Sequence, residues 1–490
     1  MEINARDGKP PERGFHPNPS QPDQVRKQDH GTSGAERLMV TLLCAAIAIF
    51  SIMESSLVPA IPTLQEAVGA STSEISWVLT GLLLSGAVTL AVVGRLGDIY
   101  GARPVLITVL GLLCAGLAIA PFAHSILVLA IAVVLQGIGI GIFPLAVALV
   151  RHSLPDHRVG TVIGLMIGLG ATGNGAGLLV SGTIVGNLGW QWLFGLPLVV
   201  LLFITALCWL LPTTALQRSV RVDWTGAVLL GLGLVCLLLS LTFVSSQGWL
   251  SVAVLGLGCA GLVIILCWAF VELRLPQPLV DLRSIRRPAV LTAYGAAAII
   301  GFATFSGIVL IPIIMALPTE TGFGLAASIT AVGLAMLPFG IAALLASSVA
   351  SRLDRRFGRW TATVSGLGAL AGGLLFLAVA HHAYWHIVVA TAVVGAGTGL
   401  GVTGTTTNVV SMVGSHETGT ATALALITRN IGGSVGAQVG ATVLASFADP
   451  ATSLPTDGGV SVAFVVAAAA AVLGMAFCLA VGRRCIAETA

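Results

Sequence analysis

Long apolar segments recur along the whole chain and are separated by short polar ones. A helix needs about 20 consecutive apolar residues to cross the hydrocarbon of a bilayer, and each segment meets this length. The pattern predicts an all-α membrane protein with fourteen transmembrane helices. The predicted helices lie at about 38–62, 75–96, 104–123, 125–150, 159–185, 190–212, 224–245, 251–272, 289–315, 325–350, 360–380, 384–410, 418–447 and 459–482.

Polar stretches divide these helices into groups of six, two and six. Residues 1–36 combine several prolines with charges of both signs, a composition that does not bury a core, so we predict a disordered cytoplasmic tail. The first apolar run is too long for a signal peptide, and we expect it to stay as a membrane helix. The predicted parts are therefore the tail 1–36, an N-terminal six-helix half 37–213, a linker with two inserted helices 214–288, a C-terminal six-helix half 289–483 and a tail 484–490.

Basic residues predict the orientation, because Lys and Arg accumulate in cytoplasmic loops. With both termini inside, the inner segments contain every lysine and arginine except Arg429, whereas the outer loops carry acids such as Glu66, Glu320 and Asp457. The tryptophans fall near helix ends, as an aromatic belt requires. Arginine outnumbers lysine, and Ala and Gly are abundant, which is typical of a GC-rich bacterial genome. We predict a multi-pass protein of the bacterial cytoplasmic membrane with both termini cytoplasmic.

Composition excludes several other classes of protein. Charged residues make up 9% of the chain, against about 25% in soluble domains. No basic tract is interleaved with aromatics, so nucleic acid is not an expected partner. Neither Lys9 nor Lys27 ends a phosphate-binding loop, so no nucleotide site is expected. The cysteines lack paired spacing, and His382 and His386 have no acidic ligand nearby in sequence, so we predict no cofactor and no metal site.

The two groups of six helices look like copies of one another. The loop after the second helix reads Gly94-Arg-Leu-Gly-Asp98-Ile-Tyr-Gly101-Ala-Arg103, and the matching loop of the second group reads Arg352-Leu-Asp354-Arg-Arg-Phe-Gly358-Arg359. Closely spaced glycines recur in the fifth helix of each group, and we predict helix-packing or hinge positions there. These are Gly168, Gly173 and Gly177 in the first group and Gly432 and Gly436 in the second. Repeated halves of this kind place a transport site at their interface near the midplane.

These motifs resemble the major facilitator superfamily, and in particular its fourteen-helix branch of drug:proton antiporters, over about residues 38–482. The family's loop pattern is matched by Gly94, Asp98, Gly101 and Arg103, with Ala102 where a first basic residue is usual. Gln136-Gly137-x-Gly139, the stretch Gly168 to Gly182 and the stretch Arg429 to Gly436 also resemble signatures of this branch. The resemblance implies the major facilitator fold. It also implies that Asp98 acts with this loop as a conformational latch that bonds to the other half and holds the outward-facing state.

Three positions depart from the family pattern. Val133 stands where the fourth helix usually has an arginine linked to proton coupling, and Leu178 stands where the fifth helix has a proline. In the first helix the branch usually has an Asp nine residues before a proline, whereas Glu54 lies eight residues before Pro62.

Among the charged side chains, only Glu54 and Arg429 lie well inside predicted helices. Burying either in hydrocarbon costs a few kcal/mol, so each is expected to face the protein interior or a water-filled cavity. We predict that both take part in proton coupling, with Glu54 binding a proton on one side and releasing it on the other. The alternative for Glu54 is a glutamate that reaches interfacial water. Arg429 pairs either with Glu54 or with an acidic group on the substrate.

Further candidates for the substrate cavity are amides and phenylalanines inside the predicted helices. The amides could bind cargo by hydrogen bonds, although satisfying nearby backbone is the commoner role, and the phenylalanines could equally pack or face lipid. The candidates are Asn174, Asn408, Asn430, Phe143, Phe302, Phe305 and Phe339.

The sequence therefore predicts a transporter and not an enzyme. Its leading function is proton-coupled export of small amphipathic or lipophilic compounds, such as drugs or antibiotics, by alternating access. Its partners are the small-molecule substrate, protons and the lipid bilayer, and we expect a monomer. The alternatives are a dedicated exporter of one self-made metabolite, an anion symporter and a membrane-embedded lipid-modifying enzyme. The clustered His/Asp/Glu set that such an enzyme needs, and the charge rings of a channel, are not evident in the sequence.

Overall fold

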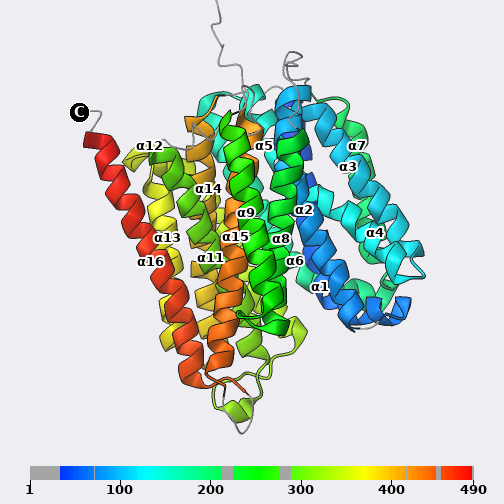
Figure 1. The fold of residues 1–490 in the computed structure, drawn as a ribbon, viewed down its shortest axis with the longest axis vertical. Helices are drawn as coiled ribbons and strands as arrows, with labels where there is room; N and C mark the ends of the chain where they lie inside the picture. The colour runs from blue at the N-terminus through cyan, green and yellow to red at the C-terminus, as the bar shows by residue number, and fades with distance from the viewer. Residues whose placement is uncertain are drawn as a thin grey trace, which may run out of the picture.

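The computed structural model describes residues 34–70, 72–211, 224–274, 288–414, 417–448 and 454–487. Within these ranges the chain is helical between short connections, and the β-structure amounts to one isolated bridge between Ala448 and Pro455. Figure 1 shows the long helices running side by side along the long axis of the molecule. The predicted all-helical, polytopic fold is thus confirmed. Residues 1–33 of the predicted tail and parts of the predicted linker lie outside the described residues.

The first group of predicted helices corresponds to six rods, which we call the N-terminal half. The fourth apolar run is two helices, because the chain tightens into a 3₁₀ turn at Ile138–Gly141. Gly139 and Gly141 of this turn approach Phe50 and Val93 closely, so the turn sits where neighbouring helices leave little room. The bounds are α1 Gly34–Val68, α2 Thr72–Tyr100, α3 Ala102–Ile119, α4 Ile126–Gly137, α5 Ile142–Ser153, α6 Asp156–Leu188 and α7 Trp192–Cys208.

The inserted pair and the second group follow in the predicted order, and we call the second group the C-terminal half. Its last helix continues to Ala487, into the stretch expected to be the tail 484–490. The inserted helices are α8 Trp224–Gln247 and α9 Val252–Arg274. The second group is α11 Pro288–Ala316, α12 Ile329–Phe357, α13 Thr361–Val379, α14 Tyr384–Met412, α15 Thr418–Ser446 and α16 Asp457–Ala487.

Twelve helices among the described residues are long and apolar enough to cross a membrane, and a thirteenth is counted if the bent pair Leu179–Leu188 and Trp192–Cys208 forms one span. Two helices, α7 and α15, do not meet this criterion of length and hydropathy on their own. The helix α7 has 17 residues, at the lower limit for a span. The helix α15 carries Arg429, amides and several threonines, yet it is surrounded by α2, α5, α8, α11, α14 and α16. A helix enclosed by protein needs little apolar surface, which explains its polarity.

The two halves repeat the same set of helix contacts. In the N-terminal half the first helix packs on the fifth and sixth rods, the second on the fourth, and the third on the fourth and sixth. The C-terminal half contains the equivalent contacts, α11 with α15 and α16, α12 with α14, and α13 with α14 and α16. The halves meet along two seams that are related by the same repeat, namely α6 with α12 and α2 with α15.

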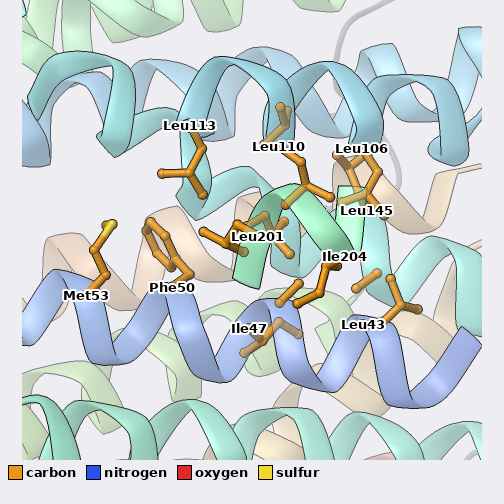
Figure 2. Packing of buried hydrophobic residues seen from close by; sticks show 14 of the residues in the cluster. Leu43, Ile47, Phe50, Met53, Leu106, Leu110, Leu113, Leu145, Leu201 and Ile204 are labelled. Atoms are coloured by element: carbon orange, nitrogen blue, oxygen red, sulfur yellow. The ribbon is translucent and has the colours of Figure 1, made fainter. Parts of the chain in front are cut away.

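Each half has its own apolar core. In the N-terminal half, α1 contributes Leu43, Ile47 and Phe50, whose spacing places them on one helical face. Figure 2 shows this face turned toward leucines of α3 and toward Leu201 and Ile204 of α7. A separate cluster fills the C-terminal half with residues of α11 to α16. The two largest apolar clusters are therefore centred each on one half.

Glycines allow the closest helix approaches in both halves. A methyl group added at Gly173 would lie 2.8 Å from the carbonyl oxygen of Ala48, so α6 and α1 pack backbone to backbone there. The equivalent glycines of α15 pack in the same way on α11, whereas Gly168 faces the other half. The neighbours are Leu344 for Gly168, Ala48 for Gly173, Ile52 for Gly177, Ala298 for Gly432 and Phe302 for Gly436.

Candidate functional site

The seam between α6 and α12 is polar at two levels. The Thr172 hydroxyl donates to the carbonyl oxygen of Gly340 at 2.9 Å, and the hydroxyls of Thr161 and Ser351 lie 3.2 Å apart. Glycines recur along the seam, and the two backbones approach closely at Gly164, Gly168 and Gly340.

The seam between α2 and α15 is joined by Asp98. We call the end of the bundle where α1 begins and α16 ends the terminal end, and the opposite end the far end. Near the terminal end, the Asp98 carboxylate accepts hydrogen bonds from the backbone N–H groups of Gly419 at 3.0 Å and Thr420 at 2.9 Å. It also accepts one from the Thr420 hydroxyl at 2.6 Å. These N–H groups belong to the first turn of α15, where they have no partner within the helix, so an acid of one half caps a helix of the other.

The other motif residues near Asp98, namely Gly94, Gly101 and Arg103, each have a structural role. A methyl group at Gly94 would lie 2.8 Å from the carbonyl oxygen of Gly419, so glycine lets α2 reach the start of α15. Gly101 has φ +90°, a backbone conformation that favours glycine, and it separates α2 from α3. Arg103 donates to the carbonyl oxygen of Trp209 at the end of α7, within its own half.

The repeated loop of the C-terminal half makes a different set of bonds. Asp354, the counterpart of Asp98, accepts a hydrogen bond from the N–H of Ala362 at 2.7 Å, so it caps the next helix of its own half. The neighbouring Arg355 reaches the other half and donates to the carbonyl oxygen of His157 at 2.7 Å. Both loops therefore tie the two halves together at the terminal end, one through a carboxylate and the other through a guanidinium.

Glu54 on α1 and Arg429 on α15 belong to opposite halves, and their opposite charges are near enough to interact. Both side chains are half-buried. The ion pairs within 4.0 Å among the described residues do not include these two, so the opposite charges attract at a distance greater than direct contact. The Nε of Arg429 is enclosed and has no hydrogen-bond partner in the described structure. A buried donor of this kind is costly to leave unpaired and favours an anion or water beside it.

The amide candidates occupy three different environments. Asn174 follows Ile167 by two helical turns on α6, and Ile167 packs against the cores of both halves, so Asn174 lies on the interior face of α6. Its side chain is exposed, which means that open space lies beside it. Asn430 is half-buried next to Arg429 on α15. Asn408 is 2% exposed, and its Nδ2 has no partner among the described residues.

The phenylalanine candidates are all half-buried and lie in two places. Phe143 packs against the core of the N-terminal half and against residues of the α2–α15 seam. The ring of Phe305 faces Gly433 of α15, one turn from Arg429. Phe302 lies on the same helix as Phe305, and Phe339 of α12 packs against the core of the C-terminal half. The structure thus places Phe305 one turn from Arg429, and Phe339 at the core of the C-terminal half.

The inserted helices cover one of the two seams. Leu230 and Leu234 of α8 and Trp268 of α9 cluster with Leu90 of α2 and with Ala423, Leu426 and Ile427 of α15. At the far end, Trp249 in the α8–α9 connection donates to the Thr442 hydroxyl of α15 at 2.9 Å. The packing of α8 and α9 on the α2–α15 seam was not predicted from the sequence, because the hydrophobicity of a segment does not indicate which helices it contacts.

A family model described as the Major Facilitator Superfamily matches residues 43–437, which is most of the chain. The chain belongs to the major facilitator superfamily. The predicted resemblance is therefore confirmed at the level of the family. In agreement, the fold is similar to the crystal structure of the human organic anion transporter MFSD10, with a TM-score of 0.63 at 16% sequence identity, over 91% of this chain and 100% of that chain.

Curated relatives of this superfamily member include proteins of Mycobacterium tuberculosis and of Streptomyces glaucescens. It is 26% identical to the MFS-type transporter Rv1877 of Mycobacterium tuberculosis over 84% of this chain, although the match spans only 60% of that protein's length. It is also 26% identical to the multidrug resistance protein Stp of Mycobacterium tuberculosis, over 84% of this chain and 76% of Stp. The tetracenomycin C resistance and export protein of Streptomyces glaucescens shares 26% identity over 83% of this chain and 76% of its own length.

Proposed function

We propose that this protein exports small amphipathic or lipophilic compounds, such as drugs or antibiotics, across the bacterial cytoplasmic membrane in exchange for protons. The observation that carries the proposal is the pair Glu54 and Arg429, two half-buried charges of opposite sign on opposite halves, of which the guanidinium has an enclosed Nε without a hydrogen-bond partner among the described residues. The names of the relatives Stp and the tetracenomycin C export protein support drug or antibiotic export as the direction and cargo class. In this proposal the protein is a transporter and not an enzyme.

The proposed coupling follows from what each orientation of the halves does to Glu54. When Glu54 faces Arg429, the cation stabilises the carboxylate and favours release of the proton. When the halves move and the cation is withdrawn, an acid in apolar surroundings takes up a proton. Arg429 keeps its charge at any ordinary pH, so it also favours neutral or acidic cargo over simple cations. Asn174, Asn430 and Phe305 lie where they would line the cargo site.

The membrane arrangement is part of the same proposal. Counting α7 and α15 as spans, with α4 and α5 as one, gives fourteen transmembrane helices, and the enclosure of α15 by other helices removes the objection that it is too polar. We place the terminal end in the cytoplasm because Arg95, Arg103, Arg151 and Arg355 lie at that end. Asp98 and Arg355 then hold the cytoplasmic end closed, and the described structure corresponds to an outward-facing state. In Figure 1 the lower end of α2 leans away from α15, which agrees with this assignment.

The test is efflux measured in energised inverted membrane vesicles with neutral, cationic and anionic compounds, with and without a protonophore. We expect the wild type to accumulate neutral or acidic compounds and the protonophore to abolish accumulation. Glu54→Gln is expected to lose accumulation but to retain exchange of cargo down its own gradient, because cargo binding does not need the proton. Glu66→Gln, an exposed glutamate on the same helix, is the matched control and should behave as wild type.

Arg429→Ala provides the second arm. We expect it to lose binding of acidic compounds more than of neutral ones, with Arg352→Ala, an exposed arginine at the end of α12, as its control. Accumulation that resists the protonophore would refute proton exchange. Full accumulation by Glu54→Gln would remove this residue from coupling. A dedicated exporter of one metabolite, which the name of the tetracenomycin C relative also supports, would accept one compound of the panel or none.

A further inference from the structure

Three side chains with metal-binding atoms meet at the far end of the C-terminal half. His381 and His382 follow the end of α13, and Asp457 begins α16. The Nε2 atom of His381 lies 2.8 Å from Oδ1 of Asp457, and the Nε2 atom of His382 lies 3.3 Å from the same oxygen. The ligand atoms of the three residues all lie within 4.8 Å of one another. Sequence reasoning considered His382 with His386 and expected no acidic ligand nearby, because Asp457 is distant in sequence and only the fold brings it there.

His381 is held in an orientation that suits a metal ligand. Its side chain is 1% exposed, and its Nδ1 lies 2.8 Å from the carbonyl oxygen of Leu377. A carbonyl oxygen only accepts hydrogen bonds, so Nδ1 carries a proton and donates it, and Nε2 is the ring nitrogen that faces Asp457. Phe323 packs edge-on against the ring, with ring centroids 5.8 Å apart, and fixes its plane. A histidine that donates from one nitrogen to a backbone carbonyl while the other faces a ligand site is the usual arrangement around a bound metal.

The close approach of His381 and Asp457 needs a cation between them. With Nδ1 of His381 donating to Leu377, the 2.8 Å between its Nε2 and the Asp457 carboxylate requires a proton or a metal ion between these two atoms. A proton would serve that one pair. A metal ion would serve the pair and His382 as well, whose ring stacks on His381 at 4.6 Å between centroids.

The distances agree with those of a tetrahedral zinc site. Zinc binds histidine nitrogen and carboxylate oxygen at about 2.0–2.2 Å, so two ligand atoms of one tetrahedron lie roughly 3.3 Å apart. The observed separations of 2.8 and 3.3 Å need only small side-chain adjustments to reach this value. His382 and Asp457 are 49% and 56% exposed, so the ion has a path from solvent and a fourth position open to water.

We propose that His381, His382 and Asp457 form a binding site for a divalent transition-metal ion of the zinc type, with two nitrogen ligands and one oxygen ligand. The ion would tie the α13–α14 connection to the start of α16, two segments that a long stretch of sequence separates. All three ligands belong to the C-terminal half, so the site stiffens that half at the far end and takes no part in the proposed coupling at Glu54 and Arg429. Its test is therefore independent of transport.

The experiment measures zinc binding to the purified full-length protein in detergent. The protein carries an affinity tag without histidines and is stripped with a chelator, and Zn²⁺ is then titrated in competition with a chromogenic chelator. We expect one zinc ion per chain, a higher melting temperature with zinc than without it, and an affinity at least about tenfold weaker in His382→Gln and in Asp457→Asn. His124→Gln, an exposed histidine outside the cluster, is the control and should bind as wild type.

Titration with Co²⁺ gives a second readout, because a tetrahedral site produces visible absorption that the two variants should lack. If Asp457→Asn does not yield folded protein by size-exclusion chromatography, His382→Gln still tests the site, because the His382 side chain is half-exposed and its replacement should leave the fold intact. Less than one zinc ion per chain in the wild type would overturn the proposal, and so would equal affinities in wild type and His382→Gln. Equal losses in His382→Gln and His124→Gln would show nonspecific binding to surface histidines and would overturn it too.

Discussion

Replacing Asp98 with alanine should open the terminal end of the protein. The carboxylate bonds to two backbone N–H groups and one hydroxyl at the start of α15, and all three groups belong to the opposite half. Alanine removes all three bonds at once. The two N–H groups become free for water when the halves separate, so the change favours the separated arrangement over the closed one.

The size of the effect follows from the capping geometry. An acidic side chain that caps a helix contributes about 1–2 kcal/mol, and its attraction to the positive end of the helix adds roughly 0.3–1 kcal/mol. Asp98 is half-buried, so solvent weakens this second contribution. A total of about 2 kcal/mol corresponds to roughly a thirtyfold shift between the closed and open arrangements, because 1.4 kcal/mol is a factor of ten.

The shift can be measured as a distance between spin labels on the two halves. Labels at Tyr100→Cys on α2 and Ser411→Cys on α14 occupy exposed positions at the terminal end, one in each half. They would be introduced in a variant without native cysteines. In the wild type we expect one main short distance, and in Asp98→Ala a second, longer distance with a large share of the population. Transport should slow in parallel, because alternating access needs both arrangements.

The matched control is Asp354→Ala, since Asp354 makes an equivalent capping bond inside its own half. It should lower stability without lengthening the distance between the labels. An unchanged distance distribution in Asp98→Ala would refute the reasoning. A shift of the same size in Asp354→Ala would show that general loosening, and not the bond between the halves, is responsible.

The remaining predictions concern packing. Gly436→Leu places a side chain against the backbone of Phe302, and this overpacking should lower the free energy of unfolding by about 1–3 kcal/mol and lower the melting temperature. In the control Gly372→Leu the side chain enters open space, and the melting temperature should change little. Phe50→Ala removes a ring that is 7% exposed from the core of the N-terminal half and should cost about 3–5 kcal/mol. Leu202→Ala, at a position 52% exposed, should cost under about 0.5 kcal/mol. Equal melting temperatures within either pair would contradict the packing described above.

The long helices follow from the sequence because hydrophobic length is a property of each segment alone. The predicted segment 384–410 corresponds to α14 at Tyr384–Met412, and 224–245 corresponds to α8 at Trp224–Gln247. The 3₁₀ turn at Ile138–Gly141 was not predicted, since it depends on what α1 and α2 place beside it. The predicted span 125–150 corresponds to the candidate span Ile126–Ser153, which contains this turn between α4 and α5.

The candidate site could be predicted from the sequence only at charged residues that lie inside apolar helices. Glu54 and Arg429 stand out in sequence because each is costly inside an apolar run, and the structure brings them near enough for their charges to interact. The partners of Asp98 were not predictable by residue, because its bonds go to backbone groups of Gly419 and Thr420, which carry no sequence signal. For His381, His382 and Asp457, the usable signal was that the His-His pair and the acid both fall at helix ends on the same predicted side of the membrane.

The inserted helices make the two seams between the halves differ in their exposure to lipid. The seams α6–α12 and α2–α15 are equivalent by the internal repeat, yet α8 and α9 pack over the second one. A lipophilic molecule dissolved in the bilayer therefore meets one junction shielded by an extra layer and one without that layer. Lateral access from the membrane to the α2–α15 junction would require α8 and α9 to move aside, whereas the α6–α12 junction does not carry this extra layer.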